Sequence, residues 1–149
     1  MRSSTFLTLI CLQLACLTAF GRLLPGGSTD QSTKITPELE ELINDGLEQL
    51  NRQGGDFAIG DMKKVVVMKY STQVVAGTLS NLLLEVRLKQ GSKLVSMKLL
   101  DQAWTNTVHK LTQGCVYTKK SGNFYPAKCD SVSACQDLLT QKGTCWSNQ

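Results

Sequence analysis

The chain has 149 residues, 42% of them hydrophobic, with a formal net charge of +4. This length fits one ordinary domain and excludes a two-lobed enzyme, while the apolar content is normal for a packed core. The positive charge is too mild for the dense lysine and arginine face of a nucleic-acid-binding domain, so we expect no nucleic-acid partner. Six cysteines in so short a chain require an explanation.

Residues 1–21 have the pattern of a secretory signal peptide. Arg2 supplies the positive charge, and an apolar stretch over residues 6–20 follows it. Ala19 and Gly21 are small residues at the two positions that signal peptidase reads, so we expect cleavage between Gly21 and Arg22. A membrane anchor is the alternative, but about 15 apolar residues are few for crossing a bilayer. We therefore expect a secreted, extracellular protein with no membrane span.

Removal of this leader takes two cysteines, Cys11 and Cys16, and leaves four. These four all lie in the last quarter of the chain: Cys115, Cys129, Cys135 and Cys145. An even number of cysteines in an exported chain predicts two disulfide bonds, with three possible pairings. Their spacing does not fit the paired ligands of a zinc site, so we expect no metal.

The mature chain is expected to begin with an extended, mobile arm over residues 22–34, because glycine and proline punctuate it. A helix over Thr36–Gln53 follows, with Thr36 at the N-cap and Pro37 in the first helical position. Gly54-Gly55 ends it. One apolar stripe runs along this helix and consists of Ile35, Leu39, Ile43, Leu47 and Leu50.

Antiparallel strands are expected after the helix, over Met62–Tyr70, Thr78–Leu88, Lys93–Leu100 and Thr107–Thr112. Alternation in the second of these strands predicts that one set of residues faces inward: Leu82, Leu84, Val86 and Leu88. The other set is expected to face outward: Asn81, Leu83, Glu85 and Arg87. The expected fold class is α+β, with a single helix wrapped by a four- or five-stranded antiparallel sheet.

No group of residues has the pattern of a catalytic site. The only histidine, His109, lies within a short expected strand, and bridged cysteines are not nucleophiles. The glycine pairs do not join a strand to a helix, as a phosphate-binding loop would require. We expect neither an enzyme nor a bound cofactor.

Two breaks between strands are apolar where turns are normally polar. The segment Gln73, Val74, Val75, Ala76, Gly77 separates two strands, and an apolar hairpin tip favours insertion into a partner's groove. Trp104 falls in the later break at residues 101–105, and an indole in a surface turn is typical of a contact anchor. A buried strand through Val74-Val75 and a core tryptophan are the alternatives.

The motif Gln73-x-Val75-x-Gly77 is similar to the Gln-x-Val-x-Gly first-loop signature of the cystatins, which inhibit papain-like cysteine proteases. Cystatins also have a helix before this hairpin, apolar residues before a glycine in the N-terminal trunk, and a tryptophan in a second hairpin. Here Thr36–Gln53, Leu23–Gly27 and Trp104 resemble those features. The resemblance covers Leu23 to Cys115 and is closest to secreted, insect-type members.

Several positions depart from the family's pattern. Ala103 replaces the usual proline before the hairpin tryptophan. Cys115 resembles the later member of a family disulfide whose earlier position is Val95. The loop after the helix has no asparagine of the kind with which some cystatins inhibit legumain, so we do not expect that activity.

The resemblance implies a reversible, competitive and monomeric inhibitor that places an apolar wedge in the cleft of papain-like, cathepsin-type proteases. Leu24 would enter a substrate pocket, and the hairpin tips would occupy neighbouring sites. The implied contact residues are Leu23, Leu24, Gly26, Gln73, Val74, Val75, Ala76, Gly77 and Trp104.

Residues 116–149 extend beyond the cystatin-like domain expected over residues 22–115. With Cys129, Cys135 and Cys145, this basic tail is expected to form a small disulfide-stapled extension, including a short helix that begins near Ser133. It raises an alternative function, a host-defence or toxin precursor. In that case the tail is the active part, and the cystatin-like domain is a pro-piece or a non-inhibitory binding module.

Overall fold

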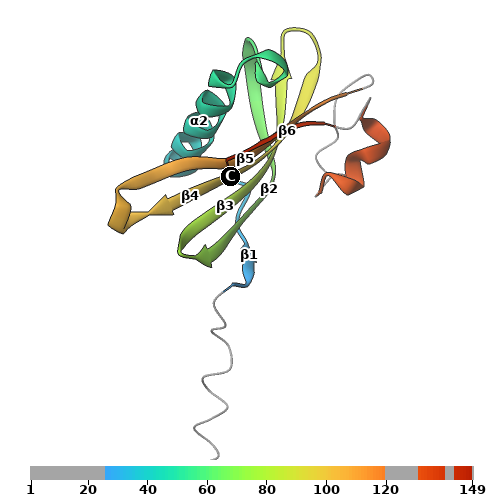
Figure 1. Cartoon of the computed structure of the whole chain (residues 1–149). Coiled ribbons are helices and arrows are strands. Elements are labelled where there is room, and N and C mark those ends of the chain that lie inside the picture. The colour runs from blue at the N-terminus through green and yellow to red at the C-terminus, as the bar shows by residue number, and fades with distance from the viewer. Residues whose placement is uncertain (1–25, 120–130, 140–142, 149) are drawn as a thin grey trace, which may run out of the picture.

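The computed structural model describes residues 26–119, 131–139 and 143–148. In these residues one α-helix, α2 (Pro37–Arg52), lies across a six-stranded antiparallel sheet in which each strand pairs with the next along the chain (Figure 1). The strands are β1 (Ser28–Asp30), β2 (Met62–Val75), β3 (Gly77–Leu88), β4 (Ser92–Gln102), β5 (Thr107–Thr118) and β6 (Thr144–Ser147). Short 3-10 helices are η1 (Gly55–Phe57), η2 (Ala103–Thr105) and η4 (Ser133–Leu138). The predicted α+β class is confirmed.

Local sequence signals set the limits of α2. The Thr36 hydroxyl accepts a hydrogen bond from the Leu39 N–H at 3.3 Å, as an N-cap should, and Pro37 begins the helix. The predicted stripe is buried from Leu39 onward, but Ile35 is 46% exposed because it precedes the cap. Beyond the helix, Gly54 has φ +69°, a conformation that glycine adopts without strain.

The main core lies between α2 and the facing side of the sheet. It includes three of the four residues predicted to face inward on β3, Leu82, Leu84 and Val86, and the fourth, Leu88, is partly buried against it. Two glycines let the helix approach closely. A Cβ at Gly46 would lie 2.7 Å from the Met97 sulfur, and one at Gly114 would lie 2.6 Å from a Leu50 methyl carbon. The helix is therefore fixed against β4 and β5.

The opposite face of the sheet carries a second buried cluster. Met68, Leu83 and Leu94 from the sheet pack there with Cys135 and Leu139 from the C-terminal tail. Leu83 faces away from the helix, as the alternation predicts, but it is buried because the tail covers this face.

Glu85 lies on the same outward face and has no exposed surface. Its carboxylate makes an ion pair with Arg87 at 3.1 Å. Lys119 is also close enough to interact with Glu85. Burial lowers the pKa of Lys119, and the Glu85 charge partly opposes that shift. A buried carboxylate therefore lies beside the second cluster, because Glu85 pairs with Leu94 in register.

The sheet has six strands, not the predicted four or five, because short strands extend both edges. β1 forms within the arm that the sequence suggests is mobile, and Ser28 pairs with Gln73 of β2. At the other edge β6 pairs with β5, which runs to Thr118 rather than ending at Thr112. Strands of three or four residues are too short for an alternating pattern to reveal them.

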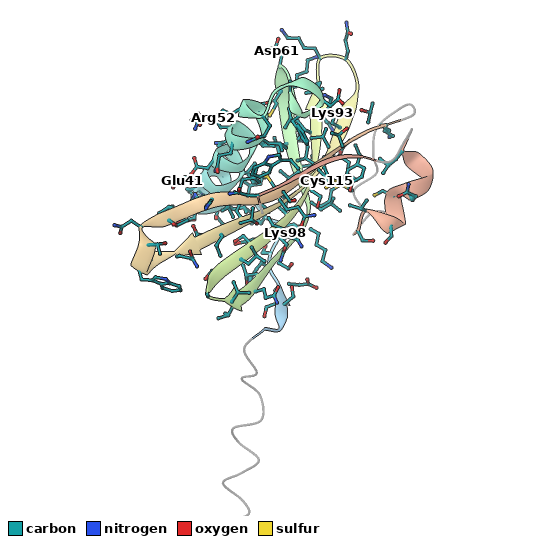
Figure 2. The ribbon with its side chains drawn as sticks, viewed as in Figure 1. Glu41, Arg52, Asp61, Lys93, Lys98 and Cys115 are labelled. Carbon is teal, nitrogen blue, oxygen red and sulfur yellow. A yellow bond between two sulfur atoms is a disulfide. The ribbon has the colours of Figure 1, made fainter. Side chains whose placement is uncertain are left out.

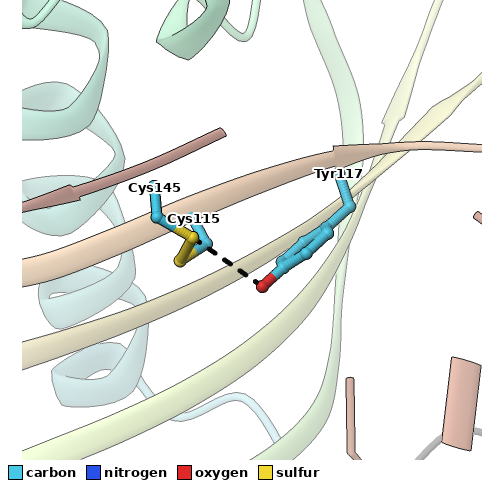
Figure 3. The surroundings of a disulfide bond; sticks show 3 residues. All are labelled: Cys115, Tyr117 and Cys145. Carbon is cyan, nitrogen blue, oxygen red and sulfur yellow. Dashed lines mark hydrogen bonds between the residues drawn. A yellow bond between two sulfur atoms is a disulfide. The ribbon is translucent and has the colours of Figure 1, made fainter. Parts of the chain in front are cut away.

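A disulfide bond joins the two strands at this edge. Cys115 of β5 and Cys145 of β6 are opposite each other in register, with 4.0 Å between their Cα atoms (Figure 3). The Tyr117 hydroxyl lies 3.9 Å from the Cys145 sulfur. Cys135 is also disulfide-bonded, to a cysteine outside the described residues, where Cys129 lies too. Val95, the family's position for a partner of Cys115, is buried in the core.

Candidate functional site

The first hairpin ends in an exposed apolar tip. Only Ala76 separates β2 from β3, and Val74 and Val75 immediately before it are 63% and 44% exposed. The alternative of a buried strand at these residues is therefore wrong. The predicted apolar tip is present.

Gly77 brings this tip against the second hairpin. Its φ is +117°, and a Cβ added there would lie 2.2 Å from the main-chain oxygen of Asp101. Only glycine fits both the backbone conformation and the space. Close packing of the two hairpins therefore requires glycine at the last position of the signature motif.

The second hairpin presents Trp104 to solvent. Trp104 lies in η2, between β4 and β5, and is 67% exposed, which excludes the core alternative. Asn106 closes the turn with φ +52°, a region that asparagine tolerates better than most residues. Val108, just beyond the turn, is 69% exposed. Its exposure is not predictable from the sequence, because a single valine among polar residues is typical of an inward position in a strand.

The N-terminal trunk reaches the first hairpin through Gln73. Leu23 and Leu24 lie outside the described residues, which begin at Gly26. The Gln73 side-chain amide donates a hydrogen bond to the Gly26 carbonyl at 2.8 Å. The first residue of the signature motif thus holds the trunk beside the tip that the motif forms.

A second glutamine, Gln102, connects the two hairpins. Its side-chain amide donates a hydrogen bond to the Ala76 carbonyl at 2.6 Å. Trunk, first hairpin and second hairpin therefore lie together at the end of the sheet away from the β3–β4 turn (Figure 1). We call this set the tip edge; it consists of Gly26, Gln73–Gly77 and Gln102–Trp104. No motif in the sequence around Gln102 predicts this contact.

The described part of the chain contains no cluster of three or more histidine, cysteine, aspartate or glutamate side chains that could hold a metal ion. The tip edge offers apolar side chains and main-chain groups instead. Its chemistry is that of shape-complementary binding.

A match to the family described as the Cystatin domain spans residues 26–122, which is more than half of the chain. The chain belongs to the cystatin family. The cystatin match contains the whole tip edge and stops before η4 and β6, so the tail lies beyond it although β6 extends the same sheet. A search of curated proteins found no match.

Proposed function

We propose that this cystatin is a reversible, competitive inhibitor of papain-like cysteine proteases, and that the tip edge is the wedge that enters their active-site cleft. The observation that carries the proposal is the connection of the tips by side-chain hydrogen bonds. Gln73 bonds the trunk, and Gln102 bonds the first hairpin. Exposed apolar residues contribute little to the stability of the fold. Fixed together at one edge, they suit binding in the groove of a partner protein.

The hydrogen bonds between the tips matter because a segment that becomes ordered only on binding loses affinity through its loss of conformational entropy. A flexible, substrate-like chain loses conformational freedom when it binds, whereas loops that are already fixed lose little. Val74–Gly77 and Trp104 would line neighbouring sites in the cleft, and Leu24 would enter a substrate pocket. No group is offered to the protease thiolate, so the complex should form without a covalent bond and dissociate intact.

The alternative in which the tail is the active agent has less support. Leu139 and Cys135 pack against the sheet, and Cys145 is cross-linked to β5. Release of such a tail would uncover a buried cluster. We therefore propose that the extension, residues 116–149, is a permanent part of the inhibitor. No helix within the described residues is long and apolar enough to cross a membrane. Because residues 1–21 have the pattern of a signal peptide, we propose that the protein is secreted. We also propose that it acts as a monomer.

The test is inhibition of papain by the mature protein, measured at several substrate concentrations. We expect an apparent inhibition constant that rises linearly with substrate, and activity that returns on dilution. Removal of residues 22–27 and the double variant Gly77→Glu/Trp104→Ala should both weaken inhibition. Papain that stays fully active with the mature protein would contradict the proposal.

A matched control lies at the opposite end of the sheet. Asp61 and Lys89 form an exposed ion pair there, at 3.0 Å, and Figure 2 shows Asp61 far from the hairpin tips. The double variant Asp61→Ala/Lys89→Ala should inhibit papain as the unmodified protein does.

A further inference from the structure

We propose that His109 is a positioning residue that fixes the second hairpin against α2, through Asp45 on the helix and Asp101 on β4. This inference rests on the proposed function, because it explains what holds Trp104 in its place on the tip edge. We call the three residues Asp45, His109 and Asp101 the clip.

The clip has short, specific contacts. The His109 main-chain N–H donates to an Asp101 carboxylate oxygen at 2.5 Å, and its ring Nδ1 lies 2.7 Å from an Asp45 carboxylate oxygen. A carboxylate can only accept, so Nδ1 carries the hydrogen of the second bond. The His109 side chain is 17% exposed, so the ring is largely buried between the two carboxylates, which themselves remain partly open to water.

The backbone of His109 is unusual in a way that needs such support. Its φ is +45°, in the left-handed region that only a few per cent of residues other than glycine adopt, with asparagine, aspartate and histidine the most frequent among them. Two register shifts also interrupt the pairing of β4 with β5 here, between Lys98 and Leu99 and between Leu100 and Gln102. The ladder alone therefore does not fix the direction of the hairpin, and side chains must do so.

Gln49, one turn after Asp45 on α2, supports the same strand. Its amide nitrogen donates to the His109 carbonyl at 2.6 Å, and its amide oxygen accepts from the Leu111 N–H at 2.9 Å. The helix thus bonds two main-chain groups of β5, the His109 carbonyl and the Leu111 N–H, at the place where the pairing of β4 with β5 is irregular. Asp45 and Gln49 together tie β5 to a rigid element.

The clip also reaches the first hairpin. The main-chain oxygen of Asp101 is the atom against which Gly77 packs, and Gln102, the next residue, bonds Ala76. A continuous path therefore runs from α2 through His109 and Asp101 to both tips. Loss of the Asp45 contact should loosen Trp104 while the core, which lies elsewhere, stays packed.

The test compares Asp45→Ala, which removes the acceptor, with Asp45→Asn, which keeps an oxygen that can accept from Nδ1. Glu41→Ala is the matched control, because Glu41 is an exposed carboxylate one helical turn before Asp45 (Figure 2). We expect Asp45→Ala to weaken papain binding by at most about tenfold, because a hydrogen bond to a charged group stabilises a structure by about that factor or more and only part of the loss reaches the binding surface. Asp45→Asn should recover most of that loss, and Glu41→Ala should behave as the unmodified protein.

A double-mutant cycle shows whether the effect passes through Trp104. If the clip positions the second hairpin, Asp45→Ala should cost little further affinity in the Trp104→Ala background. Equal losses with and without Trp104 would overturn the proposal, as would equal affinities of the Ala and Asn variants. If Asp45→Ala does not fold, His109→Asn replaces it, because asparagine tolerates the positive φ but is too short to keep the ring's contact.

A readout without protease separates this inference from the proposed function. In NMR relaxation of the indole N–H groups, Asp45→Ala should increase the mobility of Trp104 but not of Trp146, which packs against the main core. If the mature protein fails to inhibit papain yet Trp104 alone gains mobility, the inhibitor proposal fails and the clip stands. Unchanged Trp104 mobility would overturn the clip whatever the inhibition result.

Discussion

Gly77 allows the two hairpins to pack closely against each other. In Gly77→Ala, the new Cβ would meet the Asp101 carbonyl at 2.2 Å, with φ at +117°. That backbone region is nearly restricted to glycine, so we expect a loss of roughly 1–3 kcal/mol in the free energy of unfolding, together with weaker papain inhibition. Urea denaturation and an inhibition assay measure the two effects.

Gly27→Ala is the control for this substitution. A Cβ at Gly27 meets nothing within 4 Å, and its φ is not positive. Its stability should stay within about 0.5 kcal/mol of the unmodified protein, as for most surface substitutions. Equal stability losses in the two variants would show that close packing at Gly77 is not the cause.

Trp104 should dominate the affinity of the second hairpin. An exposed indole that becomes buried in a partner typically contributes about 2 kcal/mol or more, so we expect Trp104→Ala to weaken papain binding roughly thirtyfold. The loss should come from faster dissociation, because association depends on the whole surface. Stopped-flow or biosensor kinetics measure both rates. Met62→Ala, which removes another exposed apolar side chain at the far end of β2, should leave both rates unchanged.

Tyr117 links the stability of the tail to alkaline pH. Burial raises the pKa of its hydroxyl above the ordinary value of 10.0, so the folded state favours the neutral phenol. The stability this provides is complete below pH 10.0 and is lost as pH rises through the raised pKa. We expect Tyr117→Phe to lose less stability than the unmodified protein on going from pH 9 to about pH 11. Denaturation curves at the two pH values test this, and identical losses would contradict it.

At the scale of elements, local signals were the most informative. The cap at Thr36, Pro37 and the apolar spacing predicted α2, because helices are specified by neighbours three and four residues apart. The two hairpin tips were found because apolar turns are unusual.

Elements that depend on distant partners were not predicted. β1 and β6 are strands only because an edge of the sheet is present for them to pair with. The burial of Leu83 follows from the tail that covers it, and alternation in β3 carries no information about that cover. The contacts of Gln102 and His109 likewise join residues whose proximity only the folded chain creates.

The disulfide between β5 and β6 should be the main restraint on the last strand. Its cysteines are 30 residues apart, so a chain-entropy estimate gives it about 3–4 kcal/mol of stabilisation. We expect Cys115→Ser/Cys145→Ser to lower the melting temperature by roughly 10–20 °C. Papain inhibition should be retained at temperatures where this variant is folded. An unchanged melting temperature would mean that β6 is held by its other contacts.

At the scale of the whole molecule, the two faces of the sheet pack against different parts of the chain. One face packs against α2, which bonds the second hairpin through Asp45 and Gln49, and the other is covered by the tail. In Figure 1, η4 lies away from the hairpin tips, so the cover does not obstruct the tip edge. The tail can therefore stabilise this cystatin without entering the protease cleft.

Truncation after Lys119, combined with Cys115→Ser, tests that division. It removes Cys135 and Leu139 and uncovers Met68, Leu83 and Leu94, whose exposed apolar surface should bind a hydrophobic dye. Stability should fall further than in Cys115→Ser/Cys145→Ser, which loses the cross-link alone. The difference measures what the rest of the tail contributes, namely its packing, the pairing of β6 and the disulfide of Cys135.

The tip edge remains intact in the truncated chain, because its hydrogen bonds and the Gly77 contact join residues that all lie before the tail. Papain inhibition per folded molecule should therefore stay within a few-fold of the full-length value at low temperature. Truncation that abolished inhibition while the chain stayed folded would place the tail in the binding surface. Equal stability of the truncated and disulfide variants would show that the second cluster contributes little to the fold.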